Sequence, residues 1–284
     1  MSPIKKVLAE DGVEIAYDVW GRRGGEPVLL IQGLGTDSRG WALQRMAFGR
    51  RYRCFAPDNR GVGRSGKPPG PYDLGQMGRD ALAVLDAEGI DSAHVVGASM
   101  GGVIAQILAV LHPERVRSLV LACTSCRHHQ WRREVLQEWA DRVQAGGMGA
   151  LGGDALRWLI GPRLRKRFGM WLNLLARIVI QAQPETFAAQ VQAILAAPDD
   201  LRFELVNVQV PTLVITGSQD ALTPIGDAEE LAEMIPHARL VELRGAAHGL
   251  MAESPNAFNA AVLAFLDQTT DATGSALDEA AETA

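Results

Sequence analysis

The serine at position 99 stands in a pattern that suits a nucleophile. The segment Ala93–Gly102 reads AHVVGASMGG, which is a short apolar run, then the pattern G-x-S-x-G, then an apolar helical stretch. A serine on such a strand-to-helix turn is pushed out of the sheet, and Gly97 and Gly101 leave out the Cβ atoms that the turn would crowd. The following helix would direct free backbone amides at the same place. Ser99 is therefore predicted to be a nucleophile, the alternative being a tight Gly-Ser turn without chemistry.

One histidine lies where it could activate that serine. An alcohol does not attack at neutral pH without a base. Of six histidines, His248 alone directly follows a late strand candidate, in the small loop Gly245–Gly249 (GAAHG). The small neighbours leave the ring room to turn over the sheet edge. A lone loop histidine is more often a surface residue, but this position indicates a general base.

A base of this kind needs a carboxylate that holds its tautomer. Asp220 follows the apolar run Thr212–Thr216, so it would lie at the carboxyl end of a strand, where sites in open α/β sheets gather. Asp227 and Glu229 lie further on, in a helix predicted to begin near Pro224, and we interpret them as helix N-terminal charges. The chain order is then Ser99, Asp220, His248, which neither chymotrypsin-like nor subtilisin-like enzymes share.

Short apolar runs alternate with helical patterns over most of the chain and supply the frame for these residues. Several runs are continuously apolar, as in strands buried on both faces of a parallel sheet. The strand candidates are Val13–Trp20, Val28–Ile31, Arg53–Ala56, Ala93–Val96, Val116–Ala122, Thr212–Thr216 and Arg239–Leu243. The helix candidates are Gly78–Glu88, Met100–Leu111 and Pro255–Leu266. The alternation predicts an α/β fold with a mostly parallel central sheet and helices on both faces.

The alternation stops between residues 125 and 204, a helical segment with four of the six tryptophans. We predict that residues 1–124 and 205–267 form the core domain and that 125–204 form an inserted helical cap. The alternative is a set of ordinary packing helices within the same domain. Residues 268–284 are small and acidic and contain no aromatic residue, so we expect a disordered acidic tail.

The composition excludes several classes of protein. The 284 residues suffice for one large domain, and the net charge of −5 does not favour nucleic acid as a partner. No apolar run reaches the roughly 18 residues of a membrane span, and no signal-like segment opens the chain, so we expect a cytoplasmic protein. Three cysteines do not make a disulfide scaffold. Cys123 and Cys126 form a C-x-x-C, but at a strand end and not at a helix start, which disfavours a redox role.

Four motifs together resemble the α/β-hydrolase superfamily over about residues 12 to 267. They are Ile31–Gly35 (IQGLG), Pro57–Gly66 (PDNRGVGRSG), Gly97–Gly102 (GASMGG), and the pair GSQDALTP and GAAHG. Within that superfamily the chain is similar to the branch of 3-oxoadipate enol-lactonases, small carboxylesterases and cofactor-free haloperoxidase-like enzymes. This resemblance implies a serine triad and neither a metal nor an organic cofactor.

The oxyanion of a tetrahedral intermediate needs two donors in this fold. One is expected to be the backbone amide of Met100, just after the nucleophile, and the other that of Leu34, in the loop after the strand Val28–Ile31. The family often has His-Gly in that loop, whereas this chain has Gln32-Gly33. Gln32 could orient the loop, or it could be an ordinary buried glutamine. Asp58 and Arg60 of the PDNRG motif are interpreted as structural.

The expected function is a serine hydrolase that cleaves a small or medium ester or lactone through an acyl-enzyme. Three alternatives remain open: a carbon–carbon bond hydrolase with the same triad, a haloperoxidase-like perhydrolase, and a non-catalytic binding protein, which the intact triad disfavours. The partner is a small molecule, and the sequence does not predict the oligomeric state.

The predicted cap contains two kinds of candidate pocket residues. An inward-turned arginine would favour a substrate that carries a carboxylate. Apolar side chains would instead roof the site over a neutral substrate, which we prefer. The arginines are Arg127, Arg132, Arg133, Arg142, Arg157, Arg163, Arg165 and Arg167, and the apolar candidates are Trp139, Trp158, Trp171, Leu172, Leu174, Leu175 and Ile178.

Overall fold

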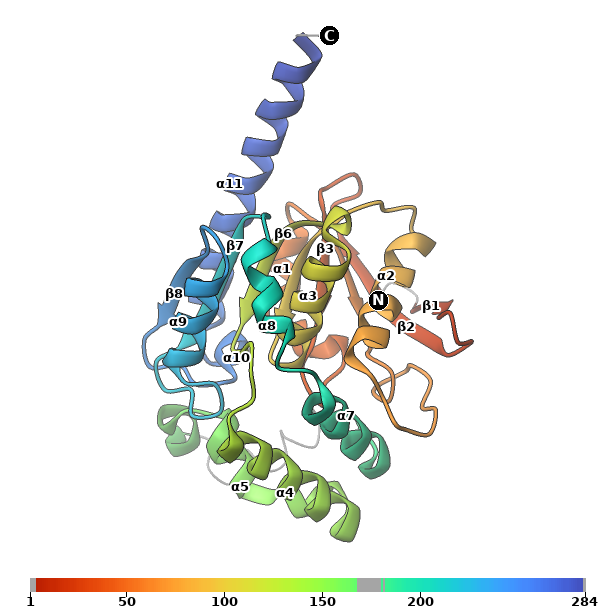
Figure 1. The fold of residues 1–284 in the computed structure, drawn as a ribbon, viewed down its shortest axis with the longest axis vertical. Coiled ribbons are helices and arrows are strands. Elements are labelled where there is room, and N and C mark those ends of the chain that lie inside the picture. The colour runs from red at the N-terminus through yellow and green to blue at the C-terminus, as the bar shows by residue number, and fades with distance from the viewer. Residues whose placement is uncertain (1–3, 168–179, 181, 283–284) are drawn as a thin grey trace.

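One twisted sheet organises the molecule (Figure 1). The computed structural model describes residues 4–167, 180 and 182–282. Eight strands lie in the order β1-β2-β4-β3-β5-β6-β7-β8. The pairs β1–β2 and β2–β4 are antiparallel, and all other neighbours are parallel. Their bounds are β1 Lys5–Leu8, β2 Glu14–Gly21, β3 Pro27–Ile31, β4 Arg53–Pro57, β5 Ala93–Ala98, β6 Val116–Ala122, β7 Thr212–Gly217 and β8 Arg239–Leu243.

The sheet carries a hydrophobic core on each face, because successive side chains of a strand point to opposite sides. In β3, Leu29 and Ile31 belong to a core that includes residues of α2 (Leu74–Ala87), α3 (Met100–Leu111) and α9 (Ile225–Met234). Val28 and Leu30 belong to the other core, with Phe48 of α1 (Arg45–Gly49) and Phe258 of α11 (Pro255–Glu282). Burial on both faces explains why β3 reads as an uninterrupted apolar run.

All seven predicted strands are present, and the predicted α/β fold is confirmed. The strand that we did not predict is β1, whose residues KKVL are mostly exposed. It pairs with β2 at the edge of the sheet, with Lys5 opposite Tyr17. An edge strand needs no apolar face, and exposed lysines are typical of such a position, so the apolar pattern gave no signal.

Helices interrupt the chain between β6 and β7, although these two strands are neighbours, with Leu121 opposite Val214. The helices of this stretch whose bounds the structure describes in full are α4 (Gln130–Gly146), η3 (Met148–Leu151), α5 (Gly152–Leu159), α7 (Pro184–Ala196), α8 (Leu201–Glu204) and η4 (Leu205–Asn207). Figure 1 shows α4, α5 and α7 gathered beyond one end of the sheet, whereas α8 lies back beside the core. We call α4, η3, α5 and α7 the cap. The bounds of the inserted cap at residues 125 and 204 stay predictions. Trp171, Leu172, Leu174, Leu175 and Ile178 lie outside the described residues.

The C-terminal segment differs from the expected disordered tail. Helix α11 continues through residue 282, and Figure 1 shows its last turns extending away from the rest of the molecule. The tail is rich in alanine, with leucine and glutamate, all of which favour helix. The expectation of disorder weighed the lack of large apolar residues and neglected this propensity. Among the helices that the structure describes, none is both long and apolar enough to cross a membrane.

Candidate active site

Ser99 lies on a sharp turn between β5 and α3, with φ 54° and ψ −119°. Positive φ is strained for any residue with a Cβ, and such strain is typical of functional sites. The two flanking glycines permit the turn: a Cβ on Gly97 would overlap the carbonyl oxygen of Gly101, and one on Gly101 would overlap that of Ile31. The turn therefore requires glycine at both positions, as the pattern predicts.

Neighbouring strand β6 holds this turn in place. The Ser99 amide donates to the carbonyl of Ala122 (2.9 Å), and the hydroxyl of Thr124 donates to the Ser99 carbonyl (2.8 Å). The Thr124 side chain also lies so close to Gly102 that a Cβ there would meet it at 2.6 Å. Sequence reasoning missed Thr124, since a threonine just past a strand end carries no distinctive signal.

His248 links the other two predicted residues. Its Nε2 lies 2.9 Å from Ser99 Oγ, and its Nδ1 lies 2.8 Å from Asp220 Oδ2. Because an ionised carboxylate only accepts, Nδ1 carries the proton and donates to Asp220, which leaves Nε2 free to accept from the Ser99 hydroxyl. His248 and Asp220 are both buried. The structure thus brings together Ser99, His248 and Asp220, which sequence reasoning had selected from three separate segments.

Asp220 is held in its ionised form by its surroundings. Its Oδ1 accepts the amides of Leu222 (2.9 Å) and Thr223 (2.8 Å), and its Oδ2 accepts the Thr223 hydroxyl (2.7 Å). Burial alone would raise the pKa of Asp220, but the charge and hydrogen bond of His248, with those of Thr223, outweigh it and lower the pKa below its ordinary value. A carboxylate here can therefore stabilise a protonated His248.

The loop after β3 runs directly beside the serine. A Cβ on Gly33 would lie only 3.1 Å from the Ser99 Cβ. Leu34 and Met100 both line the pocket onto which Ser99 opens. In the part of the chain that the structure describes, neither of their backbone N–H groups has a hydrogen-bond acceptor. Two free amides next to a hydroxyl can bind a developing oxyanion.

A cap residue braces that loop. The side chain of Gln190, on α7, accepts from the amide of Gly35 (2.9 Å) and donates to the carbonyl of Arg60 (2.9 Å). Gln190 is fully buried. The bonds connect the cap to two core loops, the one after β3 and the one after β4. A glutamine within a helical segment gave no sequence signal for this role.

A pocket of about 510 Å³ opens on Ser99 between the core and the cap. This volume is typical of a small-molecule site. The cap side is almost wholly apolar and includes Leu136, Trp139, Leu151, Ala155, Leu159, Phe187 and Ile194. Trp139 lies in the wall as expected. Trp158 does not line this pocket; its ring stacks on that of Trp131 with centroids 5.7 Å apart.

One arginine of the cap does turn inward, but its charge is already compensated. The Arg132 side chain is 2% exposed, and its Nη2 pairs with Asp227. Its Nε donates to the carbonyl of Leu222 (2.7 Å), and its Nη1 donates to Ser125 Oγ and to the carbonyl of Arg127 (2.9 Å each). Arg132 therefore anchors α4 to the loop after β7 and offers no free charge to a substrate carboxylate.

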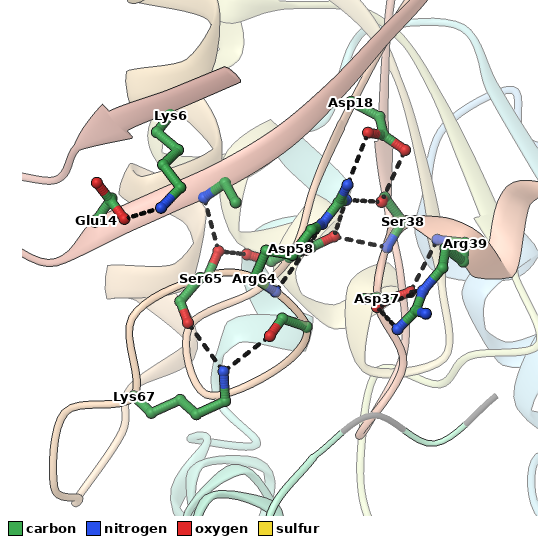
Figure 2. A network of polar contacts seen from close by, with 12 residues as sticks. Lys6, Glu14, Asp18, Asp37, Ser38, Arg39, Asp58, Arg64, Ser65 and Lys67 are labelled. Carbon is green, nitrogen blue, oxygen red and sulfur yellow. Dashed lines mark hydrogen bonds and ion pairs between the residues drawn. The ribbon is translucent and has the colours of Figure 1, made fainter. Parts of the chain in front are cut away.

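Asp58 and Arg60 have structural partners, in line with their interpretation. Figure 2 shows Asp58 between the amide of Ser38 (2.9 Å) and the side chain of Arg64 (2.8 Å), which also reaches Asp18. Arg60 forms a bidentate salt bridge with Asp80, in which Nε and Nη2 each donate to one carboxylate oxygen at 2.7 Å. Buried, paired charges of this kind fix loop geometry.

Cys123 and Cys126, the cysteines of the C-x-x-C motif, lack the properties of a redox pair. Burial raises the pKa of the Cys126 thiol to about 12 and that of Cys123 well above its ordinary value. Both thiols are free, and Cys126 Sγ lies 4.0 Å from Met234 Sδ. A thiol that stays protonated is a poor nucleophile, so these cysteines are packing residues.

Comparison with known proteins identifies the family to which this fold belongs. The model of the alpha/beta hydrolase fold family matches residues 26–255, so the chain belongs to this family. The chain is 33% identical to RutD of Azorhizobium caulinodans, which is named as a carbamate hydrolase, over 89% of this chain and 94% of that protein. It is 31% identical to 3-oxoadipate enol-lactonase 2 of Acinetobacter baylyi, over 92% and 96% of the two chains. The crystal structure of the enol-lactonase from Burkholderia xenovorans LB400 superposes with a TM-score of 0.86 at 33% identity, over 93% of this chain and all of that one.

Proposed function

We propose that this protein is a serine hydrolase that cleaves a neutral ester or lactone of small or medium size through an acyl-enzyme. The observation that carries the proposal is the unbroken chain of hydrogen bonds from Ser99 through His248 to Asp220, at the wall of an apolar pocket. Hydrolase relatives named for lactones and carbamates support the reaction class.

The first half-reaction forms the acyl-enzyme. Ser99 Oγ attacks the carbonyl carbon while His248 Nε2 takes the hydroxyl proton, and Asp220 stabilises the imidazolium that forms. The carbonyl oxygen becomes an oxyanion within reach of the Leu34 and Met100 amides, each worth about 2.7–4 kcal/mol in comparable sites. The carbon–oxygen bond to the leaving alcohol then breaks, and that alcohol takes its proton from His248.

The second half-reaction returns the enzyme to its first state. His248 Nε2 removes a proton from water, and the hydroxide adds to the acyl carbon. The same two amides hold the oxyanion. The bond to Ser99 Oγ breaks, the serine regains its proton from His248, and the carboxylic acid leaves.

The lining of the pocket supports a neutral acyl chain. The cap contributes leucine, isoleucine, phenylalanine and tryptophan side chains, and the cation of Arg132 is paired with Asp227. Among the lining residues that the structure describes, Arg132 is the one arginine or lysine, so a substrate carboxylate would lose its hydration without gaining an ion pair from them. We therefore favour a neutral ester or lactone over a carboxylate-bearing lactone.

Hydrolysis of a carbamate is a second candidate, favoured by the similarity to RutD. The same nucleophile and base would act, with the carbamoyl group as the acyl part. A neutral carbamate suits the apolar pocket as well as an ester does.

The test compares three proteins on one panel of substrates. Wild type, Ser99→Ala and the control Ser92→Ala are assayed with p-nitrophenyl esters, γ-lactones and phenyl carbamates, with and without hydrogen peroxide. Ser92 directly precedes the opposite end of β5, so the control changes the same residue type away from the pocket. Ser99→Ala should lose several orders of magnitude in kcat with an unchanged circular dichroism spectrum. Retention of more than about a tenth of wild-type activity would remove Ser99 from the mechanism.

A further inference from the structure

Glu253 is an acid in the pocket wall that the triad does not use. It ends the short helix α10 (Leu250–Glu253), shortly after His248, and it lines the same pocket as Ser99. Its side chain is partly buried. Among the residues that the structure describes, no arginine or lysine forms an ion pair with its carboxylate. A partly buried carboxylate without a cation needs other donors, and these donors indicate its role.

The two carboxylate oxygens of Glu253 bind backbone amides from two different parts of the molecule. Oε1 accepts from Ala247 (3.2 Å), the residue directly before His248. Oε2 accepts from Gly161 (3.1 Å), which follows α5 of the cap. Both oxygens accept, as those of an ionised carboxylate do, whereas a protonated acid would place an O–H against an N–H. Glu253 in its charged form therefore links the loop of the base to the cap.

A second bond ties the other side of His248 to the same part of the cap. The amide of Gly249, directly after His248, donates to the carbonyl of Leu159, the last residue of α5 (2.8 Å). Glycine at position 161 permits the first link, because a Cβ there would lie 2.6 Å from Glu253 Oε2. The backbone is thus held to this short cap segment on both sides of His248, once directly and once through Glu253.

The charge of Glu253 also acts on the base. Burial raises the pKa of Glu253 above its ordinary value, although its two amide partners oppose the shift. The nearby charge of Asp220 raises the pKa of Glu253 further, and that of His248 lowers it. The attraction between Glu253 and a protonated His248 is mutual, so this carboxylate favours the imidazolium that forms in both half-reactions.

Other ionisable groups also surround the base, and each is present in every variant compared below. Any pH dependence that they cause is therefore common to all the variants. Cys123 and His128 are neutral at neutral pH, because burial raises the pKa of the thiol well above its ordinary value and lowers the pKa of His128 to about 4. The charged groups nearby are Asp220 in the triad, Arg132 with its partner Asp227, and Arg163 beside Gly245.

We propose that Glu253 is a positioning residue for the catalytic base, whose carboxylate holds the His248 loop against the cap and adds a second negative charge to that of Asp220. This inference rests on the hydrolase function proposed above. The imidazolium develops in the transition states of both half-reactions and not when substrate binds. The interaction should therefore act on kcat more than on KM.

The experiment separates the charge of Glu253 from its reach. Glu253→Gln keeps the length of the side chain and removes the charge and one of the two acceptors. Glu253→Asp keeps the charge but is shorter by one methylene, so it cannot hold both amides. Glu233→Gln, at an exposed residue of α9, is the control for a negative charge lost outside the pocket wall. For each protein, kcat, KM and the pH profile of kcat/KM are measured with p-nitrophenyl butyrate.

We expect kcat of Glu253→Gln to fall about tenfold or more, the effect of one lost hydrogen bond to a charged group, with KM within about twofold of wild type. The acidic midpoint of its kcat/KM profile should move to lower pH, because the imidazolium loses a negative neighbour. In Glu253→Asp kcat should fall while the midpoint stays close to that of wild type. Glu233→Gln should match wild type in all three quantities.

An unchanged midpoint in Glu253→Gln would overturn the proposal, because a displaced loop alone would lower kcat/KM equally at every pH. If Glu253→Gln does not fold, Glu253→Ala serves in its place for the same comparison. Absence of any hydrolysis that Ser99→Ala abolishes would instead overturn the hydrolase function, and this inference with it.

A double variant tests the link to the cap. Gly161→Ala places a Cβ against Glu253 Oε2 and displaces the carboxylate, which should lower kcat in the wild-type background. In the Glu253→Ala background no carboxylate is left to displace, so the same change should have little further effect. Equal effects of Gly161→Ala in the two backgrounds would overturn the link between the cap and the base.

Discussion

His248 Nε2 lies 2.9 Å from Ser99 Oγ, although the two residues are 149 positions apart. Ser99 follows β5 and His248 follows β8, and β6 and β7 lie between these strands in the sheet. The loop that carries His248 folds back toward the middle of the sheet. The backbone amide of Gln219 donates to the carbonyl of Ala246 in this loop, at 2.8 Å. That carbonyl lies so close to Gly217 that no side chain fits there. The position of the His248 loop therefore depends on glycine at the end of β7.

Asp220→Asn should disable the base while preserving the fold. The asparagine amide cannot both accept from Nδ1–H and keep the present bonds from Thr223, so it favours the wrong tautomer of His248. We expect kcat to fall by about 10⁴-fold with a small change in KM. Steady-state kinetics with p-nitrophenyl butyrate measure this. A fall of less than tenfold would mean that Asp220 does not orient the base.

Asp227→Asn should affect stability and not chemistry. An exposed helix N-terminal charge, as the sequence suggests, is worth about 0.3–1 kcal/mol. In the structure Asp227 is in the first turn of α9 as expected, but it is buried and paired with Arg132. Removing one partner of a buried pair costs about 3–5 kcal/mol, so we expect a loss of that size in urea denaturation, with kcat within tenfold of wild type.

The matched control for that pair is the double variant Arg132→Met with Asp227→Leu. Apolar replacement of both partners leaves no buried charge, so the double variant should recover most of the stability lost in Asp227→Asn. A cost in Asp227→Asn below about 1 kcal/mol would instead support the simpler role as a helix N-terminal charge.

His94 should make the protein sensitive to mild acid. Burial, aided by the charge of Arg117, lowers the pKa of His94 to about 4, whereas an unfolded histidine has a pKa of about 6.5. Between these values the unfolded chain binds a proton that the folded chain does not, so stability falls as the pH drops below 6.5. At pH 5 the expected loss is about 2 kcal/mol. Urea denaturation of wild type and His94→Gln at pH 7 and pH 5 tests this, and a difference between the two proteins that does not change with pH would contradict it.

The apolar pocket should limit the length of the acyl chain. Each buried methylene adds up to about 0.8 kcal/mol, or roughly fourfold in kcat/KM, until the pocket of about 510 Å³ is full. In a p-nitrophenyl ester series kcat/KM should rise and then fall sharply. Ile194→Ala removes side-chain volume from the cap wall and so enlarges the pocket, which should move the optimal acyl length to a longer chain. Phe203→Ala, a change at an exposed residue outside the pocket lining, should leave that optimum unchanged. A flat profile from acetate to palmitate would show that the site is open.

The strands and the site residues were predictable because their signals are local. A strand buried on both faces, such as β3, must be apolar throughout, and the turn at Ser99 demands two glycines at fixed spacing. Asp220 and His248 stand at the ends of strands that are themselves recognisable. Chain order and strand ends together suffice to select these three residues from the sequence.

The remaining features depend on partners that are distant in sequence. Nothing near Arg132 indicates that it turns inward to Asp227, 95 positions away, and nothing near Gln190 indicates its bonds to the loops at Gly35 and Arg60. The lining of the pocket was only partly predicted for the same reason: Trp139 and Trp158 are both aromatic cap residues, but only packing decides which one faces the pocket. An edge strand such as β1 needs no apolar pattern at all.

The most direct measurement is covalent labelling with a fluorophosphonate, which reacts with an activated serine and mimics the tetrahedral intermediate. Intact mass spectrometry of the wild-type protein should show one adduct per chain, and peptide mapping should locate it on Ser99. Ser99→Ala should not be labelled, and Asp220→Asn should be labelled far more slowly, because its base is disabled. A label on another residue, or an adduct that forms on Ser99→Ala at the wild-type rate, would contradict the assignment of Ser99, His248 and Asp220 as a catalytic triad.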